Sequence, residues 1–149
     1  MKRTLGVALL LCSSVVAGNA ATILWAATLT GSQEIPPVNT PATGFGEVRY
    51  DTDTNILSVM MNWSGLTSIS TMAHIHCCVA TPPGNAGIAI DLWLADSPRP
   101  VSGSYMNSWD LDLVNPFRAA FVTANGGTVA SAFQALRAAM DANQGRSYF

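Results

Sequence analysis

The side chains best suited to chemistry gather in one short stretch of this 149-residue chain. Both histidines and two of the three cysteines fall between His74 and Cys78. Alternate side chains of an extended segment point to the same face, so His76 shares a face with His74, and Cys78 joins them if the strand continues. Imidazole and thiolate are borderline to soft ligands. The row therefore predicts a site for a copper-class ion, with zinc as the second choice.

The two imidazoles alone do not complete a coordination shell. Residues i and i+2 lie about 6.5–7 Å apart along a strand, close enough for two rings to hold one ion. Water, Met72 or Cys78 would supply the remaining ligands. The alternative is that both histidines are structural and hydrogen-bond to loops such as the Gln33-Glu34 segment. The residues themselves leave these two interpretations open.

The start of the chain has the pattern of an export signal. Lys2 and Arg3 precede an apolar run at residues 5–16 that is too short to span a bilayer as a helix. Small residues follow at positions 18–20, as a cleavage site requires. We expect residues 1–20 to be a signal peptide, and residues 21–149 to form one domain in the periplasm or outside the cell.

Export bears on the adjacent residues Cys77 and Cys78. In an oxidising compartment, thiols pair or bind metal more often than they stay free. Three outcomes are open for this pair: a disulfide between the two neighbours, two metal thiolates, or bonds to another chain. Because the compartment oxidises thiols, we predict the disulfide between the two neighbours.

The charge balance and the placement of the histidines argue against several functions. Without residues 1–20 the chain has five arginines, no lysine and nine acids, a formal charge of −4, so no basic patch remains for nucleic acid. We also expect no membrane contact after signal removal. No carboxylate pair is arranged for acid–base work, and neither histidine is placed for a serine triad. We therefore expect no enzymatic activity, and a copper- or disulfide-dependent redox enzyme is the least favoured interpretation.

Hydrophobic alternation with a period of two runs through most of the chain. It predicts strands near residues 23–29, 48–50, 57–63, 72–78 and 88–94, with a hairpin turn at 51–55. Residues 96–105 are expected to form a loop. Asn115-Pro116 is expected to start one helix, and Thr128 a second helix with an apolar stripe at every third or fourth residue. Short strands at this spacing are typical of an antiparallel sandwich or barrel.

Three motifs carry a resemblance to a known family. They are Gly31–Pro37 (GSQEIPP), Gly44-Phe45-Gly46, and Ala73-His74-Ile75-His76. Together they resemble the CHRD domain, a module named after chordin and also found in exported bacterial proteins, and Cys77-Cys78 is similar to a bacterial subgroup. The resemblance implies a mainly β fold, an antiparallel immunoglobulin-like or superoxide-dismutase-like β-sandwich with a helical insert near the C-terminus. It implies no agreed biochemical function.

Two further expectations follow from the resemblance. Family members continue beyond a motif like residues 145–149 into a closing pair of strands, so we expect this chain to lack its last hairpin. The segment before His76 is also similar to the copper-binding strand of copper–zinc superoxide dismutases, but those enzymes need further histidines that are absent here. We expect an exported binding module with a copper-class ion at His74 and His76. The rival is an adhesion or protein-interaction module with structural histidines and an unknown protein or cell-surface partner.

Overall fold

The computed structural model describes residues 21–34, 36–79, 84–94, 97–142 and 147–148 of the chain. The expected signal peptide, residues 1–20, lies outside the described residues. The described part is mainly β, with antiparallel sheets and helices near the C-terminus, which confirms the predicted fold class.

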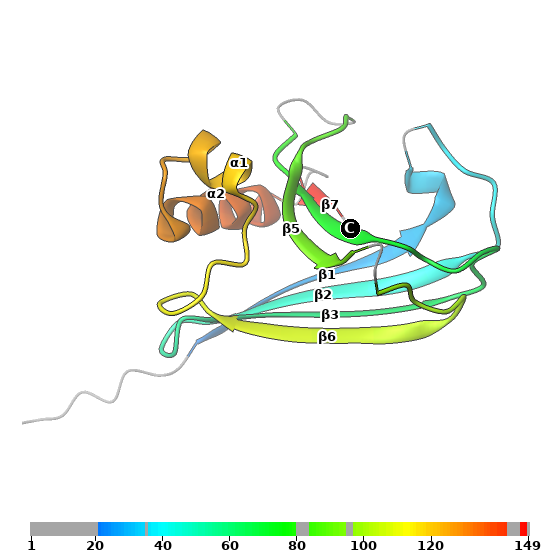
Figure 1. Ribbon diagram of the computed structural model, residues 1–149, viewed down its shortest axis with the longest axis horizontal. Coiled ribbons are helices and arrows are strands. Elements are labelled where there is room, and N and C mark those ends of the chain that lie inside the picture. The colour runs from blue at the N-terminus through cyan, green and yellow to red at the C-terminus, as the bar shows by residue number, and fades with distance from the viewer. Residues whose placement is uncertain (1–20, 35, 80–83, 95–96, 143–146, 149) are drawn as a thin grey trace, which may run out of the picture.

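The larger sheet has four strands in the order β1-β2-β3-β6. They are β1 (Thr22–Thr30), β2 (Thr43–Asp51), β3 (Ile56–Ser64) and β6 (Gly103–Asp110), and every neighbouring pair is antiparallel. In Figure 1 these four strands form the long layer at the bottom of the molecule. The β2–β3 hairpin turns at residues 52–55, where a turn was predicted.

Strand β6 was not predicted. Residues 96–105 were expected to form a loop, yet Gly103 already pairs with Trp63 at the end of β3. No side chain of β6 is fully buried, and only Tyr105 and Trp109 pack against the core, so the apolar alternation in its sequence is weak. Its backbone is held instead by an antiparallel register with β3 that extends to Asp110.

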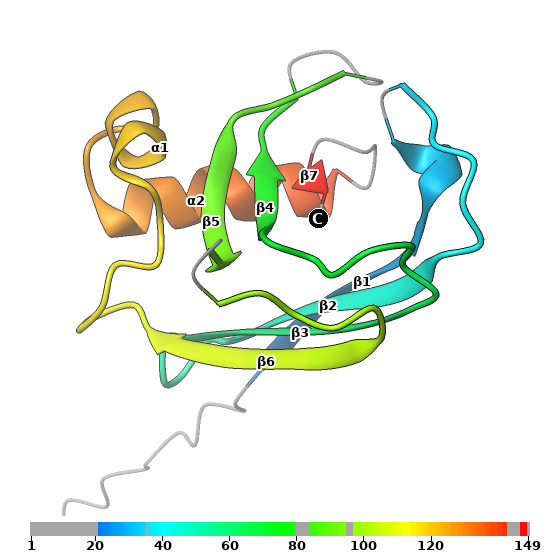
Figure 2. The same cartoon turned by 45° about the vertical axis from the view of Figure 1, so that its right-hand side comes forward.

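The smaller sheet has the order β5-β4-β7 and faces the larger one. It is formed by β4 (Ala73–Cys77), β5 (Ile88–Trp93) and the short β7 (Ser147–Tyr148). Figures 1 and 2 show it across from β1, β2, β3 and β6, as the second layer of a sandwich. The buried side chains of both sheets form one core with helical residues, including Val48, Leu57, Val59, Met61, Ile75, Ala89, Ile90, Leu92, Phe133 and Leu136.

The longer helix α2 (Val129–Asp141) begins where the sequence predicted. Thr128 is its N-cap, and the Thr128 hydroxyl accepts a hydrogen bond from the backbone N–H of Ser131 at 3.0 Å. In Figure 2 the helix runs behind β5 and β4. Its buried face reaches the larger sheet, since the rings of Phe133 and Tyr50 lie 4.3 Å apart. None of the described helices is long and apolar enough to cross a membrane.

The predicted start of the first helix at Asn115-Pro116 was wrong. Helix α1 (Ala119–Ala124) begins later, with Arg118 at its N-cap. The segment before it is held against β5, because Phe117 forms a β-bridge with Ile90 and the Arg118 N–H donates to the Ala89 carbonyl at 2.9 Å. Tertiary pairing to a strand therefore keeps these residues extended. The structure also has a short 3-10 helix, η1 (Gly31–Gln33), after β1.

Candidate functional site

The histidine-rich segment is strand β4, and its two faces differ. Ile75 and Cys77 are buried and contribute to the core, whereas His74 and His76 are half-buried on the opposite face. The two imidazole rings lie 5.6 Å apart between centroids and are nearly perpendicular, at 87°. β4 pairs with β5 through a register that shifts between Ala73 and His74 and again after Ile75.

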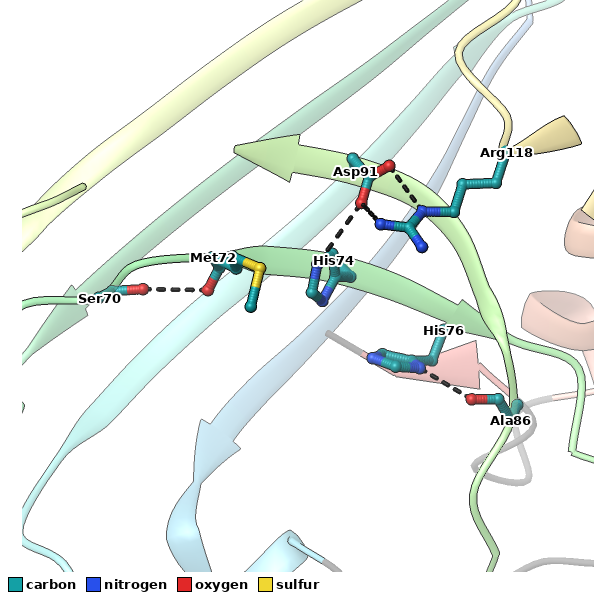
Figure 3. A network of polar contacts seen from close by, with 7 residues as sticks. All are labelled: Ser70, Met72, His74, His76, Ala86, Asp91 and Arg118. Atoms are coloured by element: carbon teal, nitrogen blue, oxygen red, sulfur yellow. Dashed lines mark hydrogen bonds and ion pairs between the residues drawn. The ribbon is translucent and has the colours of Figure 1, made fainter. Parts of the chain in front are cut away.

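His74 lies beside a carboxylate on the neighbouring strand. Its Nε2 is 3.5 Å from Oδ1 of Asp91 on β5, which is longer than a good hydrogen bond, and this buried nitrogen has no hydrogen-bond partner in the part of the chain that the structure describes. Asp91 is itself held by Arg118, whose Nε and Nη2 donate at 2.7 and 2.8 Å. Figure 3 shows this connection from His74 through Asp91 to Arg118. It joins β4, β5 and the start of α1.

The pKa values of two groups in this network are shifted. Burial removes the water that would solvate a charged imidazolium, and this lowers the pKa of His74 below its usual 6.5. Asp91 opposes that shift, whereas His76 and Arg118 add to it. The pKa of Arg118 is raised, chiefly because its guanidinium donates to Asp91. His74 is therefore neutral over a wider pH range than a free imidazole.

His76 has a different partner. Its Nδ1 lies 2.9 Å from the carbonyl oxygen of Ala86, ten residues along the chain. A carbonyl only accepts hydrogen bonds, so Nδ1 carries the proton and donates it. In the neutral ring, the lone pair is then on Nε2.

A methionine lies directly before the histidines. Met72 is half-exposed and two residues ahead of His74. Figure 3 shows its side chain on the same side of the segment as His74. The backbone there is fixed by the Ser70 hydroxyl, which donates to the Met72 carbonyl at 3.1 Å. The thioether of Met72 is a soft sulfur donor on the same side of the segment as His74.

The two cysteines do not extend this row. β4 ends at Cys77, and the sulfurs of Cys77 and Cys78 are joined to each other in a disulfide. The Cys78 sulfur lies 3.6 Å from the Ala135 carbonyl of α2, and Cys77 is in the core. A disulfide sulfur is not a thiolate, so Cys78 cannot act as the expected ligand in this state. The redox state of the pair in the isolated protein stays a prediction.

Sequence reasoning missed the partners of the histidines. Gln33, which was considered as a partner, accepts a hydrogen bond from the Thr30 N–H at 2.8 Å. Asp91 could have been predicted as a partner of a histidine, because it is the one carboxylate in β5, a strand that is otherwise apolar. Arg118 gave no signal, since its proximity depends on how residues 115–118 pair with β5.

The described residues at this face supply only part of the ligand set that a metal ion usually takes. Among the residues that the structure describes, no three His, Cys, Asp or Glu side chains are grouped so as to hold a metal ion. An ion on β4 would therefore depend on the two imidazoles together with the Met72 thioether or water.

Comparison with known proteins gives one match. A family model described as the CHRD domain matches residues 25–148. The matched range covers the described strands and helices from Trp25 in β1 to β7. No curated protein and no solved structure matches the chain.

Proposed function

This chain belongs to the CHRD domain family, and from that premise we propose that it is an exported, non-enzymatic binding module that holds one copper-class ion on the outer face of β4. One observation carries this proposal. Each histidine has one ring nitrogen beside an oxygen of the protein, Nε2 of His74 beside Asp91 and Nδ1 of His76 beside Ala86.

His76 has the arrangement typical of imidazoles that bind metals, whereas Nε2 of His74 faces Asp91 at 3.5 Å, beyond hydrogen-bond length. A metal-binding histidine usually donates its second ring N–H to a carboxylate or a backbone carbonyl, which fixes the tautomer and the ring orientation. The ligand nitrogens would then be Nδ1 of His74 and Nε2 of His76. Metal–nitrogen bonds of about 2.0–2.1 Å place the centroids of two rings on one ion about 5–6 Å apart. The observed separation of 5.6 Å agrees with that range.

The remaining chemistry favours copper over zinc. Copper(II) ranks above zinc(II) in intrinsic affinity for nitrogen ligands, and a thioether such as that of Met72 suits copper(I). The lowered pKa of His74 also supports binding, because a neutral imidazole is the form that binds a metal. Two imidazoles and one thioether leave positions for water, so we expect an affinity well below that of a closed structural site.

The test is calorimetric titration of the exported chain, residues 21–149, without a histidine tag, with Cu(II) and Zn(II). His74→Ala and His76→Ala should each weaken copper binding by about tenfold or more, because each removes one of two nitrogen ligands. Met72→Leu should weaken Cu(I) binding, measured by competition with a chromophoric chelator. Met106→Leu is the matched control, because Met106 is 76% exposed on β6 of the other sheet.

If both histidine variants bind copper as the parent does, the site is elsewhere or does not exist. We would then favour the second candidate function, which is an adhesion or protein-interaction module with structural histidines. The contact of His74 with Asp91 and the ion pair to Arg118 favour it, since they link β4, β5 and α1. Metal-free protein from the medium or periplasm, together with stability lost in His74→Ala, would support this second function.

A further inference from the structure

A second concave site lies away from the histidine face of β4. It is a cavity of about 290 Å³ where the β2–β3 turn, the turn after β6 and the start of α2 meet. The residues that matter for its chemistry are Tyr50, Asn55, Leu111, Asp112, Phe133 and Gln134. None of them belongs to the proposed copper site, so the two sites can be tested independently.

The inner wall of the cavity is apolar and well fixed. Phe133 is only 2% exposed and its ring lies 4.3 Å from that of Tyr50, with a tilt of 44°. Leu111 is buried beside them, and its N–H donates to the Asn55 carbonyl at 3.1 Å. Phe133 and Leu111 are almost fully buried and fix the wall from behind, whereas the half-buried Tyr50 supplies the aromatic surface that a ligand would contact.

The rim of the cavity carries an ordered chain of polar groups. The Tyr50 hydroxyl donates to Oδ1 of Asn55 at 2.9 Å, and Nδ2 of Asn55 donates to Oδ1 of Asp112 at 2.6 Å. This chain fixes the exposed carboxylate and leaves its Oδ2 without a partner among the described residues. The amide of Gln134, exposed on α2, lines the cavity with it.

We propose that this cavity binds one neutral, polyhydroxylated ring, the size of a single hexose. None of the described residues that line the cavity is a lysine or an arginine, which argues against an anionic ligand. An ammonium only donates hydrogen bonds, so it would leave the donors of the Gln134 amide unused. Vicinal hydroxyls both donate and accept, and the apolar face of a sugar ring suits the Tyr50 wall. The volume of 290 Å³ holds one ring and is too small for an oligosaccharide.

The experiment is an amide NMR titration of the full chain with free hexoses, their methyl glycosides and n-butylamine. Saturable shifts should appear at residues 50–55, 111–112 and 130–134, with dissociation constants on the order of millimolar, as for a small and shallow site. Binding of methyl glycosides as well as free hexoses indicates a sugar at the end of a glycan. Binding of free hexoses alone indicates a free sugar, and either result supports the proposal.

Two variants test the site itself. Asp112→Asn keeps the acceptor for Asn55 and removes the charge, and Gln134→Ala removes an exposed amide in a favourable helix position, so both should fold. Each should weaken sugar binding by about tenfold, because a ligand hydrogen bond is lost. Glu34→Gln is the matched control, since Glu34 is an exposed carboxylate at the end of η1 and outside the cavity lining. No saturable sugar binding, binding of n-butylamine alone, or sugar binding unchanged in both variants would overturn the proposal.

Discussion

A substitution at Asp91, beside His74, distinguishes between two roles of β4: a strand that binds a metal ion, and a strand whose histidines only stabilise the fold. Asp91→Asn keeps the shape of the side chain and an oxygen that can accept from Arg118, but removes the negative charge beside His74. Loss of an outer hydrogen-bond partner of a metal-binding histidine typically costs 10–100-fold in affinity. The observed distance of 3.5 Å is longer than a hydrogen bond. We therefore expect the lower end, about tenfold or about 1.4 kcal/mol of copper-binding free energy.

Arg118→Met is the matched control for this experiment. It removes the same ion pair between β5 and the start of α1, but leaves the carboxylate beside His74. Both variants should lower the thermal midpoint slightly, whereas only Asp91→Asn should weaken copper binding about tenfold by calorimetry. Equal copper affinities in parent, Asp91→Asn and Arg118→Met, with both variants less stable, would refute the orienting role of Asp91. The contact would then only brace the fold.

Four further predictions concern the protonation, packing, oxidation and processing of the chain. Because burial lowers the pKa of His74, this residue should titrate below 6.5 by NMR in metal-free protein. The free energy of unfolding should fall as the pH drops below 6.5, because the unfolded chain then binds a proton that the folded chain does not. His74→Gln should lose this part of the pH dependence. Leu136→Ala should lower the free energy of unfolding by about 2–5 kcal/mol in urea, because it opens a cavity under α2, and a loss below about 1 kcal/mol would contradict that packing. Alkylation should label Cys77 and Cys78 only after reduction, and two free thiols in freshly isolated protein would refute the predicted disulfide. Mass spectrometry of exported protein should find Ala21 at the N-terminus, and an intact Met1 would exclude cleavage.

Local patterns in the sequence were sufficient for the fold class and for several elements. Alternation of apolar residues places the core-facing side chains of β3, because a strand with one buried face must repeat with a period of two. In β5 the alternation does not hold, since Ala89 and Trp93 are buried as well as Ile90 and Leu92. Thr128 marked the start of α2 because an N-cap is a local interaction with the backbone three residues on. The motifs around Gly31, Gly44 and His74 pointed to the CHRD family, which the family model confirms.

Tertiary pairing decided the elements whose sequence carries no periodic signal. β6 is held by the pairing of its backbone with β3 and by Tyr105 and Trp109 against the core, although none of its side chains is fully buried. Phe117 and Arg118 stay outside the helix because they bond to β5, even though Oδ1 of Asn115 accepts a hydrogen bond from the Phe117 N–H as an N-cap would.

The candidate sites divide in the same way. The sequence placed His74 and His76 in one strand, since their spacing is local. It did not supply their partners, because Asp91 and Arg118 come close only when β5 and the start of α1 pack beside β4. The cavity beside Tyr50 likewise joins segments about sixty and eighty residues apart along the chain. Contacts between distant segments depend on how the sheets and α2 pack, and no local pattern encodes that geometry.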